Sequence, residues 1–103
     1  MEKVHTEATL RLFRAILTLR SEDECRLFFD DVCTIKEIQD LSQRLEVASM
    51  LSEGKNYQEI SRETGASTAT ICRVNKCLLY GDGGYKTVLD RLEPKGAPAD
   101  EKS

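Results

Sequence analysis

The stretch Asn56–Leu78, NYQEISRETGASTATICRVNKCL, places two short amphipathic patterns on either side of a single glycine, Gly65. Asn56 can cap a first helix whose third residue is Glu59, and Gly65 can end that helix because glycine adopts the left-handed conformation at low steric cost. Ser67 can then cap a second helix. Two helices joined by so short a turn predict a helix-turn-helix.

Apolar residues of this motif, residues 57–78, can meet where the two helices cross: Ile60, Ala66, Ile71, Val74 and Leu78. With this set turned inward, the outer face of the second helix carries small, hydroxyl-bearing and basic residues: Ser67, Thr68, Ala69, Cys72, Arg73 and Lys76. Such a face suits a DNA major groove, because small residues permit close approach and the N–H groups at a helix start bind phosphate. No acidic residue interrupts residues 67–76. The motif therefore predicts a DNA-binding surface.

The residues of this surface are expected to have different roles. Arg73 is the candidate for a base contact, because arginine can bond to both O6 and N7 of guanine. Lys76 and Arg62 are candidates for phosphate contacts, and Ser67 and Thr68 lie where the helix start meets the groove. Two alternatives remain open: the motif is a tight helical corner whose basic residues are solvated, or its surface binds an acidic protein partner.

Apolar residues at spacings of three and four predict a helix over residues 5–20, through Leu10, Phe13 and Leu17. Further apolar residues beside them make the apolar face of this helix unusually broad. A broad face can be buried only against neighbours on more than one side, which suggests a homodimer.

Two capping boxes predict further helix starts, Ser21 with Glu24 and Thr34 with Glu37. The first of these helices would turn four apolar residues inward: Cys25, Phe28, Phe29 and Val32. Gly54 is placed to end the second, which keeps helical spacing through six apolar residues: Ile35, Ile38, Leu41, Leu45, Ala48 and Leu51.

The run GDGG at residues 81–84 breaks the chain before a short last helix marked by four residues: Tyr85, Val88, Leu89 and Leu92. Residues 93–103 then contain two prolines and no apolar periodicity, which predicts a disordered tail. Because strand-like alternation is not found, the sequence predicts an all-α fold with one helical DNA-binding domain over residues 1–92.

The distribution of charge favours a nucleic-acid partner, and the hydropathy excludes a membrane protein. The net charge is −3, but residues 55–80 carry four basic and two acidic side chains, so the motif itself is basic. The chain shows neither the apolar core of a signal peptide nor a run of roughly 18 apolar residues. We therefore expect a cytoplasmic protein that has no membrane partner.

Metal binding and catalysis are not expected. His5 is the only histidine, and the four cysteines are scattered without a C-x-x-C pair: Cys25, Cys33, Cys72 and Cys77. In a cytoplasmic protein such cysteines are reduced, small core residues, so we expect no disulfide, no metal and no other cofactor. No carboxylate pair, nucleophile–base arrangement or phosphate-binding loop can be assembled, so we expect no enzyme.

The segment Arg44–Leu78, with GASTATICR at its centre, resembles the Trp-repressor superfamily, and SRETGASTATICRVNKCLLYGDGGYKTVLDRL is similar to its YerC/YecD-type branch. The resemblance covers residues 10–92 and is most specific at residues 65–73 and 80–85. It implies an intertwined helical homodimer whose two helix-turn-helix heads bind a palindromic operator in double-stranded DNA, in successive major grooves about 34 Å apart. It also implies four residues at the DNA surface: Thr68, Thr70, Arg73 and Lys76.

The Trp repressor holds its corepressor, L-tryptophan, between two arginines, and this chain departs from that pattern. One arginine corresponds to Arg73, whereas the second member of an Arg-x-Arg pair is Glu46 in the run Arg44-Leu45-Glu46. An anion there repels the carboxylate of the ligand, and Val74 replaces a glycine beside the indole. We therefore expect a repressor that does not bind tryptophan. A candidate pocket for a different effector comprises Arg44, Glu46, Arg73 and Val74.

Overall fold

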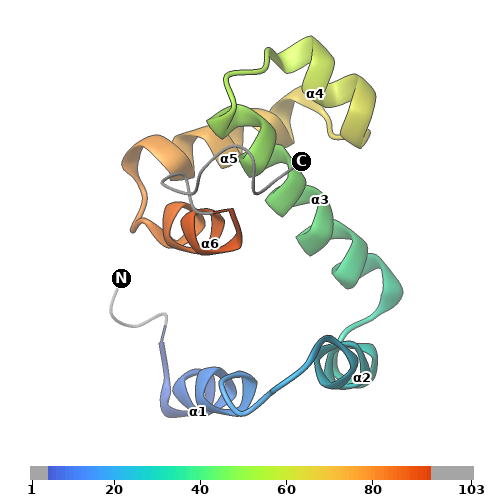
Figure 1. Cartoon of the computed structure of the whole chain (residues 1–103), viewed down its shortest axis with the longest axis vertical. Helices are drawn as coiled ribbons and strands as arrows, with labels where there is room; N and C mark the ends of the chain where they lie inside the picture. Colours follow the sequence, from blue (N-terminus) through green and yellow to red (C-terminus); the bar gives the residue numbers. More distant parts are fainter. Residues whose placement is uncertain (1–4, 94–103) are drawn as a thin grey trace. The chain divides into compact units, whose positions relative to one another are not determined.

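The computed structural model describes residues 5–93, and this part of the chain forms six helices and no strand (Figure 1). They are α1 (Glu7–Ile16), α2 (Glu22–Val32), α3 (Ile35–Ser52), α4 (Tyr57–Thr64), α5 (Thr68–Tyr80) and α6 (Gly84–Leu92). The predicted all-α class is confirmed. The predicted tail, residues 93–103, lies outside the described residues from 94 onward. Backbone contacts divide the chain into two units, one up to Ile38 and one from Gln39.

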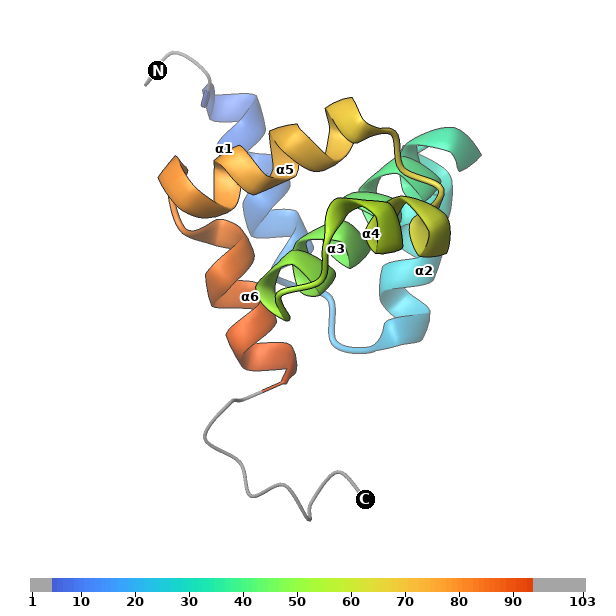
Figure 2. The ribbon, with the colours of Figure 1, turned by 90° about the horizontal axis from the view of Figure 1, so that it is seen from above.

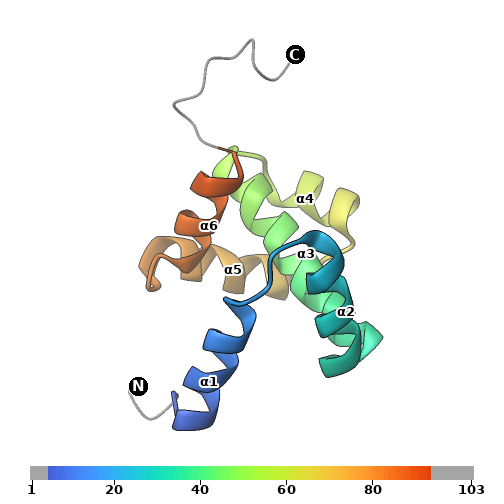
Figure 3. The ribbon, with the colours of Figure 1, turned by 60° about the horizontal axis from the view of Figure 1, so that its bottom comes forward.

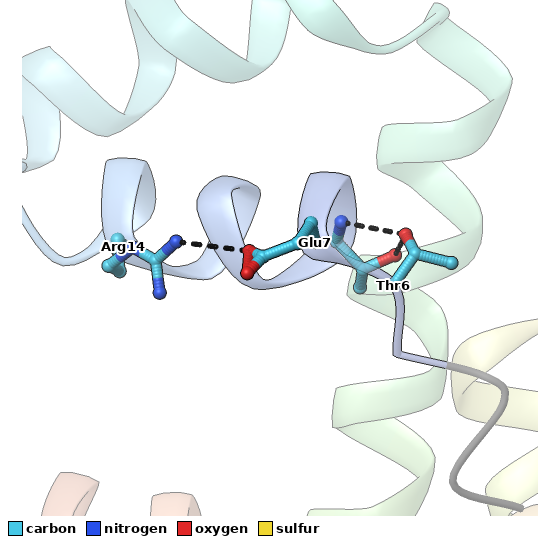
Figure 4. A network of polar contacts seen from close by, with 4 residues as sticks. Thr6, Glu7 and Arg14 are labelled. Carbon is cyan, nitrogen blue, oxygen red and sulfur yellow. Dashed lines mark hydrogen bonds and ion pairs between the residues drawn. The ribbon is translucent and has the colours of Figure 1, made fainter.

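In the first unit, α1 begins at a cap that was not predicted, Thr6. Its hydroxyl oxygen accepts a hydrogen bond from the backbone N–H of Thr9 at 3.2 Å. Within the helix, the Arg14 guanidinium pairs with the Glu7 carboxylate at 3.9 Å (Figure 4). The cap satisfies a backbone donor that has no partner inside the helix, which accounts for the start at Glu7.

The helix predicted over about residues 5–20 is shorter in the structure, where α1 runs from Glu7 to Ile16 and so ends four residues earlier. Past Ile16 the backbone N–H of Thr18 donates to the carbonyl oxygen of Ala15 at 3.1 Å, and the Thr18 hydroxyl donates to the same oxygen at 2.6 Å. A hydroxyl that donates a hydrogen bond to a carbonyl oxygen at a helix end competes with the helical hydrogen bonds, so the helix stops there.

Both predicted helix starts at capping boxes are confirmed. Before α2, Ser21 Oγ accepts from the N–H of Glu24 at 3.1 Å, although the Glu24 carboxylate bonds one residue earlier than expected, to the N–H of Arg20 at 2.8 Å. Before α3 the box is complete. Thr34 Oγ1 accepts from the Glu37 N–H at 3.1 Å, and Glu37 Oε1 accepts from the Thr34 N–H at 2.8 Å.

The helices α1 and α2 bury no side chain completely. Phe28 and Phe29 are half-buried and pack edge to face, with ring centroids 5.6 Å apart. Cys25 and Val32 are exposed, so the predicted inward set is wrong for these two. Several large apolar side chains are exposed in this unit: Leu10, Leu12, Phe13, Leu17, Leu27, Val32 and Ile35. The first unit by itself therefore does not bury these side chains.

The second unit contains the core. Figures 2 and 3 show the end of α3 flanked by α4 and α6, and α5 contacts both of those helices. The buried side chains are Val47, Ala48, Met50, Ile60, Ala66, Ile71 and Val74. Half-buried side chains close around them: Leu51, Tyr57, Leu78, Tyr85 and Leu89.

The helix α3 ends as predicted before Gly54, which has a φ of +86°. The Lys55 N–H donates back to a carbonyl oxygen of the last turn at 3.1 Å, as is typical of a glycine-terminated helix. The apolar stripe predicted along α3 is buried only in its second half. Ala48 lies in the core, but Ile35 and Leu41 are exposed because the buried contacts of this helix begin at residue 47.

The helix α5 runs two residues beyond the predicted motif, to Tyr80, and α6 begins at Gly84 after a turn made by the predicted GDGG run. The apolar residues of α6 divide into a pair that packs on the core, Tyr85 and Leu89, and an exposed pair, Val88 and Leu92. Within residues 5–93, no helix is both long and apolar enough to cross a membrane.

Candidate nucleic-acid interface

The first helix of the motif, α4, is capped at its start as predicted. Asn56 Oδ1 accepts from the N–H of Glu59 at 2.8 Å, and the Glu59 carboxylate accepts from the N–H of Asn56 at 3.3 Å. Two backbone donors at the helix start are thereby satisfied. These bonds matter because α4 has only eight residues, a length at which an isolated helix is marginal in water.

A network of hydrogen bonds holds the turn between α4 and α5. Gly65 has a φ of +77°, as predicted, and its N–H donates to the carbonyl oxygen of Ser61 at 2.8 Å. The Ser61 hydroxyl donates to the Ala66 carbonyl oxygen at 2.9 Å, and the Ala66 N–H donates to Thr64 Oγ1 at 3.1 Å. From α3, the Gln43 amide donates to the Thr64 carbonyl oxygen at 3.1 Å. The turn therefore determines the direction in which α5 leaves it (Figure 2).

The apolar set predicted to join the two helices is confirmed. Its four central members are at most 2% exposed and share one cluster with Val47 and Ala48 of α3: Ile60, Ala66, Ile71 and Val74. Burial of a side chain as large as Ile60 or Ile71 stabilises the fold by about 1.5–3 kcal/mol. Because one side of α5 packs on this cluster, the opposite side faces outward.

The outward side of α5 carries the predicted DNA-binding residues. Six of them are exposed: Ser67, Thr68, Ala69, Cys72, Arg73 and Lys76. Ser67 Oγ caps the helix by accepting from the N–H of Thr70 at 3.1 Å, and Thr70 itself is half-buried. The N–H groups of Thr68 and Ala69 have no acceptor within the helix, so they are left for an outside acceptor such as a phosphate oxygen.

The charges on this surface are basic. Across residues 5–93, none of Arg62, Arg73 and Lys76 forms an ion pair with a carboxylate. Arg62 is exposed on α4 and lies shortly before the turn at Gly65 in the sequence. The first turn of α5 also lacks an acidic residue, so the positive end of its helix dipole is not offset locally. The surface is therefore suited to an anionic partner.

The four positions of the predicted effector pocket lie in different surroundings. Val74 is 2% exposed and belongs to the core. Glu46 lines a cavity of about 120 Å³ between α3 and α6, and Arg73 is not among the residues that line it. Arg44 and Arg73, in contrast, act on the same group, the phenol of Tyr85.

Tyr85 was not predicted as a site residue. Its burial, and then the neighbouring Cys77 thiol, raise the pKa of the phenol, while the charges of Arg44 and Arg73 act in the opposite direction. Because the pKa is raised overall, the phenol keeps its proton at neutral pH. From the sequence, Tyr85 could be placed only on the apolar face of a helix. The surroundings of its ring depend on how α6 packs, which the sequence pattern does not show.

The four cysteines are free. Their predicted place in the core is wrong for Cys25 and Cys77, whereas Cys72 lies on the outer face that was predicted for the helix-turn-helix. Cys25, Cys72 and Cys77 are exposed, and Cys33 is half-buried. Cys25 lies on α2 and Cys72 and Cys77 lie on α5, while the core consists of valine, alanine, methionine and isoleucine side chains. Within the part of the chain that the structure describes, no three His, Cys, Asp or Glu side chains are grouped so that they could hold a metal ion.

Comparison with known proteins agrees with this geometry. Residues 7–93 match the family model of the Trp repressor protein. The chain is 54% identical over 93 residues to the uncharacterized protein YerC of Bacillus subtilis (strain 168), which covers 90% of this chain and 89% of YerC. It is also similar to the crystal structure of a TrpR-like protein from Eubacterium eligens ATCC 27750, with a TM-score of 0.87 and 54% identity over 91% of this chain and 97% of that one.

A second solved structure, from Staphylococcus aureus, is 53% identical to this chain and has a TM-score of 0.85. The match covers 88% of this chain and 91% of that one. The family match spans all six described helices, including the helix-turn-helix and α6. The similarity in sequence and the similarity in structure point to the same group of proteins. The chain therefore belongs to the Trp repressor family, as one of its YerC-type, TrpR-related members.

Proposed function

We propose that this chain is a sequence-specific DNA-binding transcription regulator, acting as a repressor through the outward face of α5. The family to which it belongs is one of DNA-binding regulators. The observation that carries the proposal is the outward face of residues 67–76, which is exposed and carries no carboxylate. The direction of the helix that bears this face is determined by the hydrogen-bonded turn before it. A helix with small and basic residues on its free side matches the width and charge of a DNA major groove.

Within this surface, Arg73 is proposed to contact a guanine, because its exposed guanidinium lies on the face opposite the core. Lys76 and Arg62 are proposed to contact phosphates and so to position the helix. The remaining proposed contacts come from the helix start and the small groove-facing side chains: Ser67, Thr68, Ala69, Thr70 and Cys72.

The regulator is proposed to act as a homodimer. Its first unit exposes large apolar side chains, among them Leu17 at 81% and Ile35 at 77%. Large apolar side chains exposed in such number are normally covered by a partner, and a second copy of the chain supplies apolar helices of matching character. Two helix-turn-helix motifs related by a two-fold axis would bind a palindromic operator with half-sites about 34 Å apart.

Regulation is proposed to be independent of tryptophan, and no catalytic activity is proposed. Glu46 would repel the carboxylate of an amino acid, and Val74 is buried rather than open to a ligand. Residues 1–92 would form the DNA-binding domain, which would act on duplex DNA in the cytoplasm.

Selection of binding sites from random duplex DNA by the purified protein tests the proposal. A double variant, Arg73→Ala with Lys76→Ala, removes two charges from the proposed surface. The matched control, Lys86→Ala with Arg91→Ala, removes two exposed charges from α6. We expect the wild type and the control to enrich the same palindrome and the double variant to enrich none. Enrichment of no sequence by the wild type at low salt would contradict the proposal and favour a protein partner for this surface.

A further inference from the structure

A side-chain hydrogen bond joins the middle of α3 to the end of α4. The amide nitrogen of Gln43 donates to the carbonyl oxygen of Thr64 at 3.1 Å, across 21 positions of the chain, and both residues are half-buried. Because a carbonyl oxygen can only accept a hydrogen bond, the amide group presents its nitrogen to Thr64. The bond therefore connects two helices that are separate in the sequence.

This bond lies at the edge of the apolar core. Val47 of α3 and Ile60 of α4 are fully buried in the same cluster. Gln43 lies one helical turn before Val47, and Thr64 lies one turn after Ile60, so each is on the side of its helix that carries the buried residue. Where the apolar packing between these helices ends, the Gln43–Thr64 bond thus holds the end of α4 to α3.

Thr64 also makes other hydrogen bonds that shape the turn after α4. Its hydroxyl donates to the Ile60 carbonyl oxygen at 2.7 Å and accepts from the Ala66 N–H at 3.1 Å. Its carbonyl oxygen is one of the last four of α4, which have no N–H partner within the helix. Gln43 supplies that partner, so the residue at which α4 ends is held both by the turn and by α3.

The Gln43 side chain also lies close to the turn itself. A Cβ at Gly65 would be 3.9 Å from the amide nitrogen of Gln43, which is ordinary van der Waals contact. Only residues 65–67 separate Thr64 from the first residue of α5, Thr68. Because this connection is so short, a change in the position of Thr64 relative to α3 would also change the orientation of α5.

We propose that Gln43 is a positioning residue that sets the sequence specificity of the proposed DNA-binding surface. Its bond to Thr64 holds the outward face of α5 in one orientation relative to α3. A contact of Arg73 with O6 and N7 of guanine requires a fixed orientation, whereas contacts with phosphates are independent of sequence and tolerate other orientations. This inference rests on the proposed function, because it assigns what orients the proposed base-contacting helix.

The test measures fluorescence anisotropy with two duplexes, the selected operator and a scrambled duplex of the same length and composition. Gln43→Met keeps the length of the side chain but removes the donor. It should lower operator affinity about threefold to tenfold, which corresponds to the net contribution of one hydrogen bond, and should change affinity for the scrambled duplex by less than about twofold. The matched control is Gln39→Met, because Gln39 is exposed one turn earlier on the same side of α3. It should bind both duplexes as the wild type does.

Gln43→Glu is a second variant, which keeps the shape of the side chain but carries a carboxylate that can only accept. It should lower the ratio of the two affinities at least as far, with Gln39→Glu as the control for the added charge. All variants are measured where circular dichroism shows them folded. The inference is overturned if a folded Gln43 variant keeps the ratio within about threefold of its Gln39 control, because the bond would then serve stability alone.

Failure of the proposed function gives a different result. In that case the wild type itself binds the scrambled duplex as tightly as any selected sequence, and both proposals fall together. A wild type that prefers its operator, with Gln43 variants that keep this preference, overturns only the role of Gln43.

Discussion

Replacement of Gly65 by alanine tests how much the turn between α4 and α5 contributes to the stability of the fold. Gly65 has a φ of +77°, and this left-handed conformation costs an L-residue with a Cβ about 1–2 kcal/mol. The new methyl group would have room, since its nearest neighbour, Gln43 Nε2, would lie 3.9 Å away. Alanine also restricts the unfolded chain, which offsets about 0.4–1 kcal/mol of the loss. We therefore expect a net destabilisation of about 1 kcal/mol, or a fall in melting temperature of roughly 4–8 °C.

Gly84→Ala is the matched control, because Gly84 lies in the first turn of α6, has no positive φ and has open space around its Cβ position. The same restriction of the unfolded chain, together with the higher helix propensity of alanine, should stabilise this variant by about 0.5–1 kcal/mol. Thermal and urea unfolding at one protein concentration measure both changes, since the stability of an oligomer depends on concentration. If the two variants were equally stable, or if Gly84→Ala were less stable than the wild type, the left-handed conformation of Gly65 would not account for the loss of stability in Gly65→Ala.

Four further predictions follow from the site and the fold. Arg73→Ala should weaken operator binding by about 1–3 kcal/mol and relax one base-pair position, and unchanged specificity in anisotropy titrations would remove its role as a base contact. Lys76→Ala should weaken binding to all sequences alike and lower the salt slope by about 0.9 for each lost phosphate contact, so a change confined to one sequence would contradict a phosphate role. Gly81→Ala should lower stability by about 1–3 kcal/mol, because its Cβ would press on the Cys77 carbonyl oxygen, and a melting temperature equal to that of the wild type would exclude this clash. We expect the wild type to sediment with the mass of the proposed dimer and Leu17→Asp to sediment closer to the mass of a single chain, and equal masses would contradict a dimer contact at Leu17.

The helix-turn-helix could be predicted closely because its determinants are local. Asn56 and Ser67 cap the helices that directly follow them, and Gly65 ends α4 through its own backbone conformation. The buried set that includes Ile60 and Ile71 follows from helical periodicity once those boundaries are known. Once the inward-facing residues of α5 are known, its other side chains must face outward, and these include most of the proposed site.

The features that could not be predicted depend on packing between distant segments. An apolar residue such as Val32 has the same sequence pattern whether its own chain or a second copy covers it, so its exposure was not foreseen. The end of α1 depends on the Thr18 hydroxyl, which competes with an otherwise continuous helical pattern. Tyr85 packs on the core only through the position of α6, and no local pattern indicates which helix its ring will contact.

Binding of DNA by the outward face of α5 can be tested by titrating isotope-labelled protein with the selected duplex and following the titration by two-dimensional NMR. We expect the largest amide shifts at Arg62 and across Ser67–Lys76, with small shifts in α6. Largest shifts in α1, α2 or α6, or no shifts at saturating duplex, would contradict it.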